Sequence, residues 1–370
     1  MKKIGFIVNP IAGMGGAVGL KGTDGRDVLL KALEKGASPI APARAEKFLR
    51  HLLPLKHLFE LITPPKEMGE FEALRAGFTP KVIPMQLKPE TDADDTRKAA
   101  QLMVSNGVDL LVFCGGDGTA RDILSAINQS MPVLGVPAGV KMYSAVFAND
   151  PSSAAELLTK FLSGEVDVRE AEVLDIDEEA FRRDIFNVKL FGYILTLYEP
   201  ELVQGIKTPS PQTESERNAQ LAIAKHIVEN MEDDTLYILG PGTTVRAICE
   251  YLSQPKTLLG VDLMLNRKIV ALDLDEKALL KHIDDHRKAK IIITPIGHQG
   301  FIFGRGNQQI SANVLKKVGR DNVIVIATPS KLSGLKHLKV DSGDESVDRM
   351  FRGYIKVVID YGKERVVKCV

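Results

Sequence analysis

The feature that most restricts the fold is an apolar strand that leads directly into a glycine-rich turn and a helix. Residues 108–113 (VDLLVF) form an apolar run of strand length, CGGDGT follows at 114–119, and a helical pattern follows at 120–127 (ARDILSAI). An apolar run without polar alternation is typical of a strand buried on both faces, as in a parallel sheet covered by helices. Ligands of such α/β sheets bind outside the carboxyl ends of the strands. The turn at 114–119 is therefore a candidate ligand site.

Other strands and helices alternate along the first part of the chain, which is typical of βαβ units. We expect strands at Ile4–Val8, Phe59–Ile62, Lys81–Pro84, Asp109–Phe113 and Pro132–Val136, and helices at Asp27–Lys35, Ala43–Leu53, Met68–Ala76, Asp94–Asn106 and Arg121–Asn128. Three turns, at residues 9–25, 115–119 and 137–141, follow strands of this set. Because the strands should be parallel, we expect these turns to converge at one edge of the sheet.

The pattern changes after a helix expected at Ala154–Ser163. Residues 165–177 and 184–198 are rich in β-branched and aromatic residues, which predicts antiparallel strands, and the chain ends in a hairpin around Tyr361 and Gly362. We therefore expect two domains: a nucleotide-binding α/β domain over residues 1–165, which carries the GGDGT turn, and a strand-rich mixed α/β domain over residues 166–370.

The composition excludes several classes of partner. Hydrophobic residues make up 44% and charged residues 26% of the 370-residue chain, and the formal net charge is zero. A neutral chain argues against a broad surface for nucleic acid or for anionic lipid. The three cysteines, Cys114, Cys249 and Cys369, have no metal-ligand spacing, and no apolar segment reaches membrane-spanning length. We expect a cytoplasmic protein with reduced thiols.

The GGDGT turn has the residues of a phosphate loop and one carboxylate that does not fit such a loop. Gly115, Gly116 and Gly118 can take positive φ and expose N–H groups, and the following helix directs its positive end at the loop. Thr119 suits the N-cap position and can also donate to a phosphate oxygen. Asp117 would repel phosphate unless Mg²⁺ bridges the two, or unless it accepts the proton of a hydroxyl that attacks phosphorus. A plain turn residue is the remaining interpretation of Asp117.

These residues also carry a resemblance. The order Asn9-Pro10, then GGDGT, then a proline–glycine turn resembles the NAD kinase and diacylglycerol kinase superfamily. Four stretches together are similar to its ATP-NAD kinase-type branch, which includes the acetoin-catabolism X proteins: IVNPIAGMGGAVGLKGTDG, FCGGDGTARDI, VPAGVKMYSAVFA and TPIGHQGFIFGRGNQQIS. The similarity extends from Ile7 to about Asp341.

The resemblance implies a Rossmann-like N-terminal domain, a strand-rich C-terminal domain and a kinase active site between them. It implies transfer of phosphate from ATP or polyphosphate to the 2′-hydroxyl of NAD, which gives NADP, with Asp117 as the base. Gly115, Gly116, Gly118 and Thr119 would line the donor phosphates, with Asn9 beside them. Mg²⁺ would be held mainly by the phosphates, since no protein ligand cluster is evident. Relatives are often oligomeric, so a homo-oligomer is also implied.

The sequence departs from the family pattern at the acceptor. The Asn-Glu pair that holds the adenosine of NAD in the family has no counterpart, because no Asn-Glu dipeptide occurs. The family element Thr-Pro-Thr-Gly-Ser-Thr is split: residues 294–297 keep its start, and residues 242–244 resemble its end. A kinase of another hydroxylated acceptor, or a non-catalytic sensor of NAD or ATP, therefore remains an alternative.

Several further residues are candidates for ligand binding. Gly240, Gly242, Thr243 and Thr244 have the pattern of a strand–turn–helix site for phosphate or ribose. Lys141 is placed to neutralise the transferred phosphate, and Asp24 and Thr294 are possible substrate contacts. Arg305 is a candidate phosphate clamp, because its planar fork suits bidentate binding.

Overall fold

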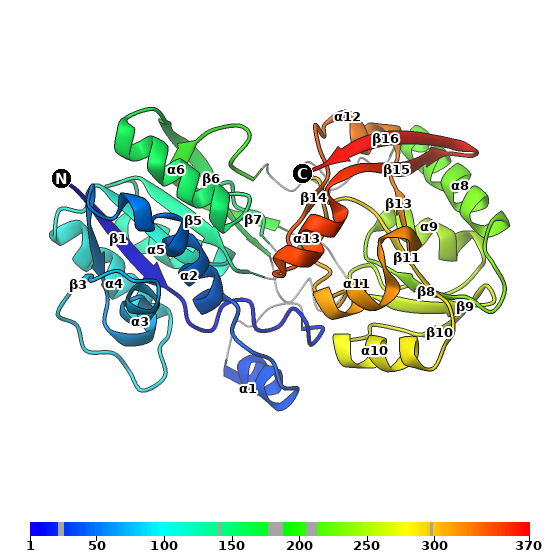
Figure 1. Cartoon of the computed structure of the whole chain (residues 1–370), viewed down its shortest axis with the longest axis horizontal. Helices are drawn as coiled ribbons and strands as arrows, with labels where there is room; N and C mark the ends of the chain where they lie inside the picture. The colour runs from blue at the N-terminus through cyan, green and yellow to red at the C-terminus, as the bar shows by residue number, and fades with distance from the viewer. Residues whose placement is uncertain (21–25, 140–141, 177–187, 205–212, 297–298) are drawn as a thin grey trace. The chain divides into compact units, whose positions relative to one another are not determined.

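A computed structural model describes residues 1–20, 26–139, 142–176, 188–204, 213–296 and 299–370. The chain forms two compact units, each with its own sheet (Figure 1). The first unit contains Met1–Met14 and Gly22–Ile206, and the second contains Gly15–Lys21 and Lys207–Val370. Among the helices that the structure describes, none is long and apolar enough to cross a membrane.

The first unit is built on a seven-stranded sheet in the order β3-β2-β1-β4-β5-β7-β6, in which only β6 runs antiparallel to its neighbour. Its strands are β1 (Lys2–Val8), β2 (Phe59–Thr63), β3 (Lys81–Val82), β4 (Leu110–Gly115), β5 (Val133–Pro137), β6 (Asp167–Ile176) and β7 (Val188–Tyr198). Its helices are α1 (Arg26–Glu34), α2 (Ala41–His51), α3 (Glu70–Arg75), α4 (Ala93–Ser105), α5 (Asp117–Ile127) and α6 (Pro151–Ser163).

Helices cover both faces of this sheet, because the strands are apolar on both sides. On one face Phe48 of α2 and Leu157 of α6 pack with Val112 of β4. On the other face Met103 of α4 and Ile123 of α5 pack with Phe113. Neighbouring residues of β4 thus point into opposite cores, as expected for a strand between two helical layers.

The second unit has a seven-stranded sheet in the order β10-β9-β8-β11-β13-β15-β16. Its strands are β8 (Leu236–Leu239), β9 (Asp262–Leu265), β10 (Lys268–Ala271), β11 (Ala289–Ile293), β13 (Val323–Ile326), β15 (Gly353–Asp360) and β16 (Lys363–Cys369), and β12 (Phe301–Phe303) pairs separately with β14 (Lys339–Val340). Its helices are α8 (Glu214–Glu229), α9 (Thr243–Tyr251), α10 (Glu276–Asp284), α11 (Ala312–Val318), α12 (Pro329–Ser333) and α13 (Glu345–Phe351). Strands β8, β11, β13 and β15 are parallel, and antiparallel strands close both edges.

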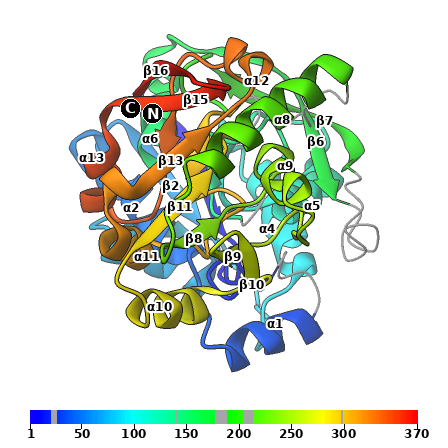
Figure 2. The same ribbon diagram turned by 90° about the vertical axis from the view of Figure 1, so that its right-hand side faces the viewer.

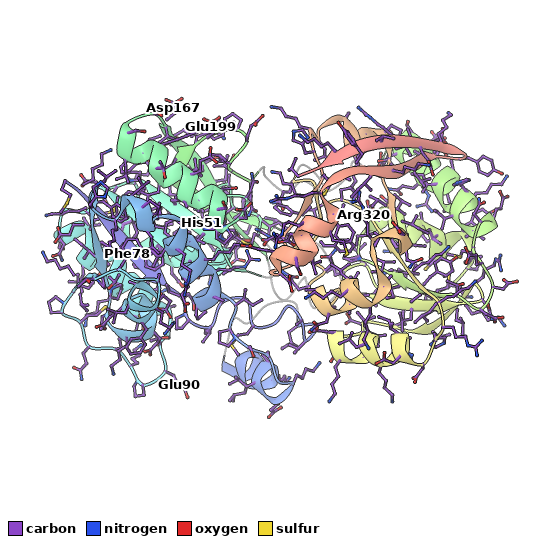
Figure 3. The ribbon with its side chains drawn as sticks, in the orientation of Figure 1. His51, Phe78, Glu90, Asp167, Glu199 and Arg320 are labelled. Carbon is purple, nitrogen blue, oxygen red and sulfur yellow. The ribbon has the colours of Figure 1, made fainter. Side chains whose placement is uncertain are left out.

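This second sheet also lies between two helical layers (Figure 2). Ile223 of α8 and Ile248 of α9 pack on one face, and Leu315 of α11 and Phe351 of α13 pack on the other. Arg320, labelled in Figure 3, donates to the carbonyl oxygens of Met350 and Tyr354 at 3.0 and 2.9 Å and so ties the segment after α11 to β15. The second unit is therefore a mixed α/β unit with a parallel centre.

The α/β fold class predicted from the sequence is confirmed, with a largely parallel first sheet and a mixed α/β second unit. The chain divides later than the expected boundary near residue 165, because the β6–β7 hairpin adds to the first sheet through β5. Asp167 pairs with Tyr198 across this hairpin, and Asp167 and Glu199 lie together at its end in Figure 3. Helix α5 begins at Asp117, earlier than the expected start at Arg121.

Candidate active site

The GGDGT turn joins β4 to α5 at the carboxyl edge of the first sheet. Gly116 is the N-cap of α5 with φ −117°, so the expected capping by Thr119 is wrong. The expected positive φ is wrong as well, because Gly115 ends β4 and Gly118 lies inside α5. The turn needs glycine for another reason: a Cβ on Gly115 would lie 2.5 Å from Thr119 Oγ1, and one on Gly116 would lie 3.1 Å from Gly139 Cα. Close approach of chain segments therefore explains these two glycines.

The three predicted turns do meet at this edge. Ala138 N–H donates to Gly115 O at 2.9 Å, which joins the turn after β5 to the turn after β4. Gly13 has φ +83°, and a Cβ there would lie 2.2 Å from Ala138 O, so the turn after β1 packs against the same segment. The expectation that the turns converge is confirmed for their described residues.

Asn9 and Thr119 come together within this arrangement. Asn9 Nδ2 donates to Thr119 Oγ1 at 2.9 Å, and the Asn9 backbone N–H donates to Cys114 O at 2.9 Å. The end of β1 is thereby fixed against the first turn of α5. Because one side chain supplies an amide and the other a hydroxyl, the pair offers hydrogen-bond donors beside the helix N-terminus.

Asp117 is the ionisable group at the centre of the site. It is only 5% exposed, and its carboxylate accepts hydrogen bonds from Tyr143 N–H at 2.7 Å and Ser144 N–H at 3.0 Å. Burial raises the pKa of Asp117 to about 7, the hydrogen bonds from Ser144 and Tyr143 oppose this rise, and the negative charge of Asp175 adds to it. The carboxyl group therefore changes protonation near neutral pH, as a general base requires.

Two residues that sequence reasoning missed lie around Asp117. Asp175 of β6 is buried and pairs with Arg121 Nη1 at 2.9 Å. Ser144 Oγ donates to Leu174 O at 2.9 Å, which holds β6 against the segment that binds Asp117. The sequence carried one partial signal, since Arg121 lies one helical turn after Asp117. No local sequence pattern links Asp175 to Asp117 or Arg121, because the contact joins β6 to α5.

The second unit brings together the two turns between which the family element is split. Strands β8 and β11 are parallel neighbours, so the turn at Gly240–Thr244 and the turn beginning at Thr294 share one edge of the second sheet. Gly242 has φ +114°, and a Cβ there would lie 2.9 Å from Thr294 Cγ2. Thr243 is the first residue of α9, and Thr244 beside it is fully buried. Both halves of the element therefore belong to one local structure.

The remaining candidates differ in their surroundings. Arg305 is 4% exposed, its Nη2 lies 2.9 Å from Asp341 Oδ2, and its guanidinium stacks over Phe301. This pairing leaves little guanidinium surface for a phosphate. Asp24 and Lys141 lie outside the described residues. Within the described ranges, no group of three or more His, Cys, Asp or Glu residues could hold a metal ion.

Comparison with known families gives two matches, one in each unit. Residues 4–166 match the ATP-NAD kinase N-terminal domain, and residues 232–369 match the ATP-NAD kinase C-terminal domain. A search of curated proteins finds no match. The two matched segments include the GGDGT turn and both halves of the split element.

Solved structures resemble the chain only distantly. A Bacillus anthracis str. Sterne protein described as a diacylglycerol kinase is 18% identical, with a TM-score of 0.25, over 48% of this chain and 45% of that one. The UDP-GlcNAc 2-epimerase of Neisseria meningitidis is 13% identical, with a TM-score of 0.25, over 93% of this chain and 78% of that one. The chain thus spans less than half the length of the diacylglycerol kinase it matches.

Proposed function

The chain belongs to the ATP-NAD kinase family, and from this premise we propose that it transfers a phosphoryl group from ATP to the 2′-hydroxyl of NAD. The observation that carries the proposal is the burial of Asp117 together with its raised pKa. A buried carboxyl group with a pKa near 7, set beside a helix N-terminus, can accept a proton at neutral pH.

The surroundings of Asp117 suit proton transfer. A carboxylate has about four lone-pair directions, and the N–H groups of Tyr143 and Ser144 use two of them. A remaining direction is available for a substrate hydroxyl. In the proposed step the hydroxyl proton passes to Asp117, the hydroxyl oxygen forms a bond to the γ-phosphorus, and the bond from that phosphorus to the ADP oxygen breaks.

The donor phosphates would bind at the same edge of the first sheet. The first-turn N–H groups of α5 give a partial positive charge there, and Asn9 and Thr119 add side-chain donors. Gly115 and Gly116 carry no side chain that would block the approach. ATP is the proposed donor, and polyphosphate has the same chemistry at the transferred group.

A divalent cation fits this site only in part. Kinases commonly use Mg²⁺ held by one or two carboxylates together with substrate phosphates, where it offsets charge on the transferred group. In the part of the chain that the structure describes, Asp117 and Asp175 are carboxylates near the turn, and both already have hydrogen-bonding partners. The residues therefore fit a cation held mainly by the nucleotide rather than a protein cage.

One sequence observation favours a second candidate function on the same chemistry. The chain has no Asn-Glu dipeptide, the pair that holds the adenosine of NAD in the family. A kinase that acts on another hydroxylated small molecule would keep Asp117 and the GGDGT turn and change only the acceptor contacts.

A direct assay separates these candidates. Purified protein with ATP and Mg²⁺ is incubated with NAD, NADH, nucleosides and small alcohols, and NADP and ADP are measured separately. Formation of NADP in step with ADP is the expected result. Turnover of ATP on another acceptor without NADP would replace NAD by that acceptor, and no acceptor-dependent ADP at all would overturn the kinase proposal.

A further inference from the structure

The second unit carries a group of polar side chains at the carboxyl edge of its own parallel strands. Strands β8, β11 and β13 are hydrogen-bonded neighbours that run in the same direction. The turn at Gly240–Thr244 follows β8, Thr294 follows β11, and Thr328 follows β13. These polar residues therefore share one edge, the edge at which parallel sheets bind ligands.

The starts of two longer helices meet at this edge. Gln220, near the start of α8, donates to Thr243 Oγ1 in the first turn of α9 at 3.4 Å. Glu216, also in the first turn of α8, accepts a hydrogen bond from Thr328 Oγ1 at 2.7 Å. Because each helix N-terminus carries a partial positive charge, their meeting favours an anion. The negative charge of Glu216 offsets part of the positive charge of the two helix N-termini.

Lys331 adds a full positive charge at the same edge. Its Nζ donates to Thr294 Oγ1 at 3.1 Å, and Thr294 packs against the turn at Gly242. Thr328 also accepts the backbone N–H of Lys331 at 3.3 Å. Glu216 therefore anchors Thr328, and Thr328 fixes the short helix that carries Lys331. The carboxylate of Glu216 thus contributes to the position of the ammonium group through Thr328.

Thr244 points to a ligand independently of these charges. Its side chain is fully buried, and among the described residues its Oγ1 has no hydrogen-bond partner. Buried hydroxyl groups in proteins are almost always hydrogen-bonded, because an unpaired one costs free energy. Thr244 lies in the first turn of α9, and Cα–Cβ bonds of a helix tilt toward its N-terminus. Thr244 is the second residue of α9, and Gly242 is the N-cap of that helix, so the unpaired hydroxyl belongs to the residue two positions after Gly242.

We propose that the second unit binds the phosphate groups of a nucleotide at this edge, with Lys331 as the counter-charge. The N–H groups at the start of α9 and the Thr244 hydroxyl would donate to the phosphate oxygens, and Thr294 would position the lysine. Both ATP and NAD carry a diphosphate linkage that suits such a site. The proposal deepens the proposed function by naming the phosphate contacts of one substrate, yet it does not depend on Asp117 as the base.

Hydrogen–deuterium exchange of the whole chain tests the site, because it reports on the two units separately. Exchange is followed in peptides that cover residues 242–246 and, separately, residues 115–121, with increasing inorganic pyrophosphate. Pyrophosphate should slow exchange at 242–246. Removal of one charge-assisted contact in Lys331→Met should raise the concentration needed for half protection by about tenfold.

A second variant and a matched control complete the experiment. Thr244→Val keeps the side-chain shape, so it should fold and should also weaken protection at 242–246. Lys288→Met makes the same charge change just before β11 begins, at the opposite end of the strand from Thr294, and should leave protection unchanged. If the midpoints of Lys331→Met and Thr244→Val both equal the midpoint of the original protein, the proposal is overturned.

Arms with ATP and with NAD identify which nucleotide is held. Protection at 242–246 by either one supports the site, and the effective nucleotide names the substrate. Pyrophosphate, ATP and NAD all without effect there would overturn the proposal. If Asp117→Asn loses activity but keeps protection at 242–246, the phosphate site of the second unit is supported independently of the kinase reaction. The proposed function and the proposed phosphate site can therefore fail separately.

Discussion

The backbone N–H of Tyr143 donates to Asp117 Oδ2 at 2.7 Å, which binds the segment after β5 to the first residue of α5. This contact fixes the orientation of a buried carboxylate whose pKa is raised to about 7. The backbone N–H groups of Tyr143 and Ser144 therefore hold the Asp117 side chain in place, and burial raises its pKa. Three predictions follow from this arrangement.

The first prediction concerns Asp117→Asn. An amide cannot accept the hydroxyl proton, so kcat should fall by about 10²- to 10⁴-fold, the usual contribution of a general base. Nucleotide affinity should change little, because the amide keeps the size of the carboxylate. Steady-state kinetics with a separate binding measurement check this. Asp122→Asn is the control, since Asp122 lies in the same helix and pairs with Arg97 at 2.7 Å. Unaltered turnover in Asp117→Asn would show that Asp117 is not the base.

The second prediction concerns the pH dependence of the rate. Only the ionised form of Asp117 can accept a proton, and burial raises its pKa to about 7. The rate should therefore fall on the acidic side of neutrality, by about tenfold per pH unit well below that pKa. A profile of kcat/KM against pH in the free enzyme reports it. Asp175→Asn removes a negative charge that raises the pKa of Asp117, so the acidic limb should move to lower pH. A limb that stays in place in Asp175→Asn would contradict this coupling.

The third prediction concerns stability. Because the pKa of Asp117 is higher in the folded state than in the unfolded state, the folded protein binds more protons between the two values. The contribution of Asp117 to stability is thus fully present below about pH 4 and is lost as pH rises through about 7. The whole change is up to about 4 kcal/mol, roughly three pKa units at 1.4 kcal/mol each. The difference in unfolding free energy between the original protein and Asp117→Asn should show this pH dependence, and a constant difference from pH 4 to 8 would contradict it.

The sequence contained the information for this site only where that information is local. Apolar runs predicted β1 and β4, and the GGDGT pattern placed Asp117 at a strand-to-helix turn. The contacts that set its pKa were not predictable, because Tyr143, Ser144 and Asp175 reach Asp117 from later segments. The predicted start of α5 at Arg121 is too late, because glycines are typical of turns, whereas Gly118 lies inside the helix in this structure.

In the second unit too, contacts between segments far apart in the chain could not be predicted from the sequence. The turns at Gly242 and Thr294 were recognised from their residues, but only the parallel pairing of β8 and β11 shows that they are neighbours. Lys331 was not recognised at all, since it lies in a short helix far along the chain from Thr294. Arg305 was expected to be available to a ligand, yet it is buried against Asp341, a partner 36 residues away in the sequence.

The fourth prediction concerns Gly115→Ala. A Cβ at this position would lie 2.5 Å from Thr119 Oγ1 and 2.7 Å from Thr119 Cβ, so the first turn of α5 must shift. Overpacking of this kind commonly costs about 1–3 kcal/mol. The unfolding free energy should fall by that amount, and the Asn9–Thr119 hydrogen bond should be disturbed with loss of nucleotide affinity. Denaturant unfolding and a binding titration measure both effects. A variant with unchanged stability and affinity would show that the turn has room for a side chain.

The last prediction uses the buried hydroxyl of Thr244. In the ligand-free protein this hydroxyl has no hydrogen-bond partner among the described residues, so Thr244→Val should remove a desolvation cost and raise the unfolding free energy by about 1 kcal/mol. Thr328→Val is the matched control. Thr328 is equally buried, but its hydroxyl donates to Glu216 at 2.7 Å and accepts from Lys331, so its loss should destabilise the protein by about 1–3 kcal/mol.

Denaturant unfolding without and with ATP or NAD measures both threonine variants. A ligand that binds through Thr244 stabilises the original protein more than Thr244→Val, by an amount that grows with the logarithm of ligand concentration over Kd. At a saturating ligand concentration the original protein should therefore have the higher unfolding free energy of the two. The position is then one where an unpaired buried group lowers stability in the absence of ligand and contributes to binding in its presence. If Thr244→Val destabilises the ligand-free protein as strongly as Thr328→Val does, the hydroxyl of Thr244 has a partner within the fold, and its role in binding phosphate is excluded.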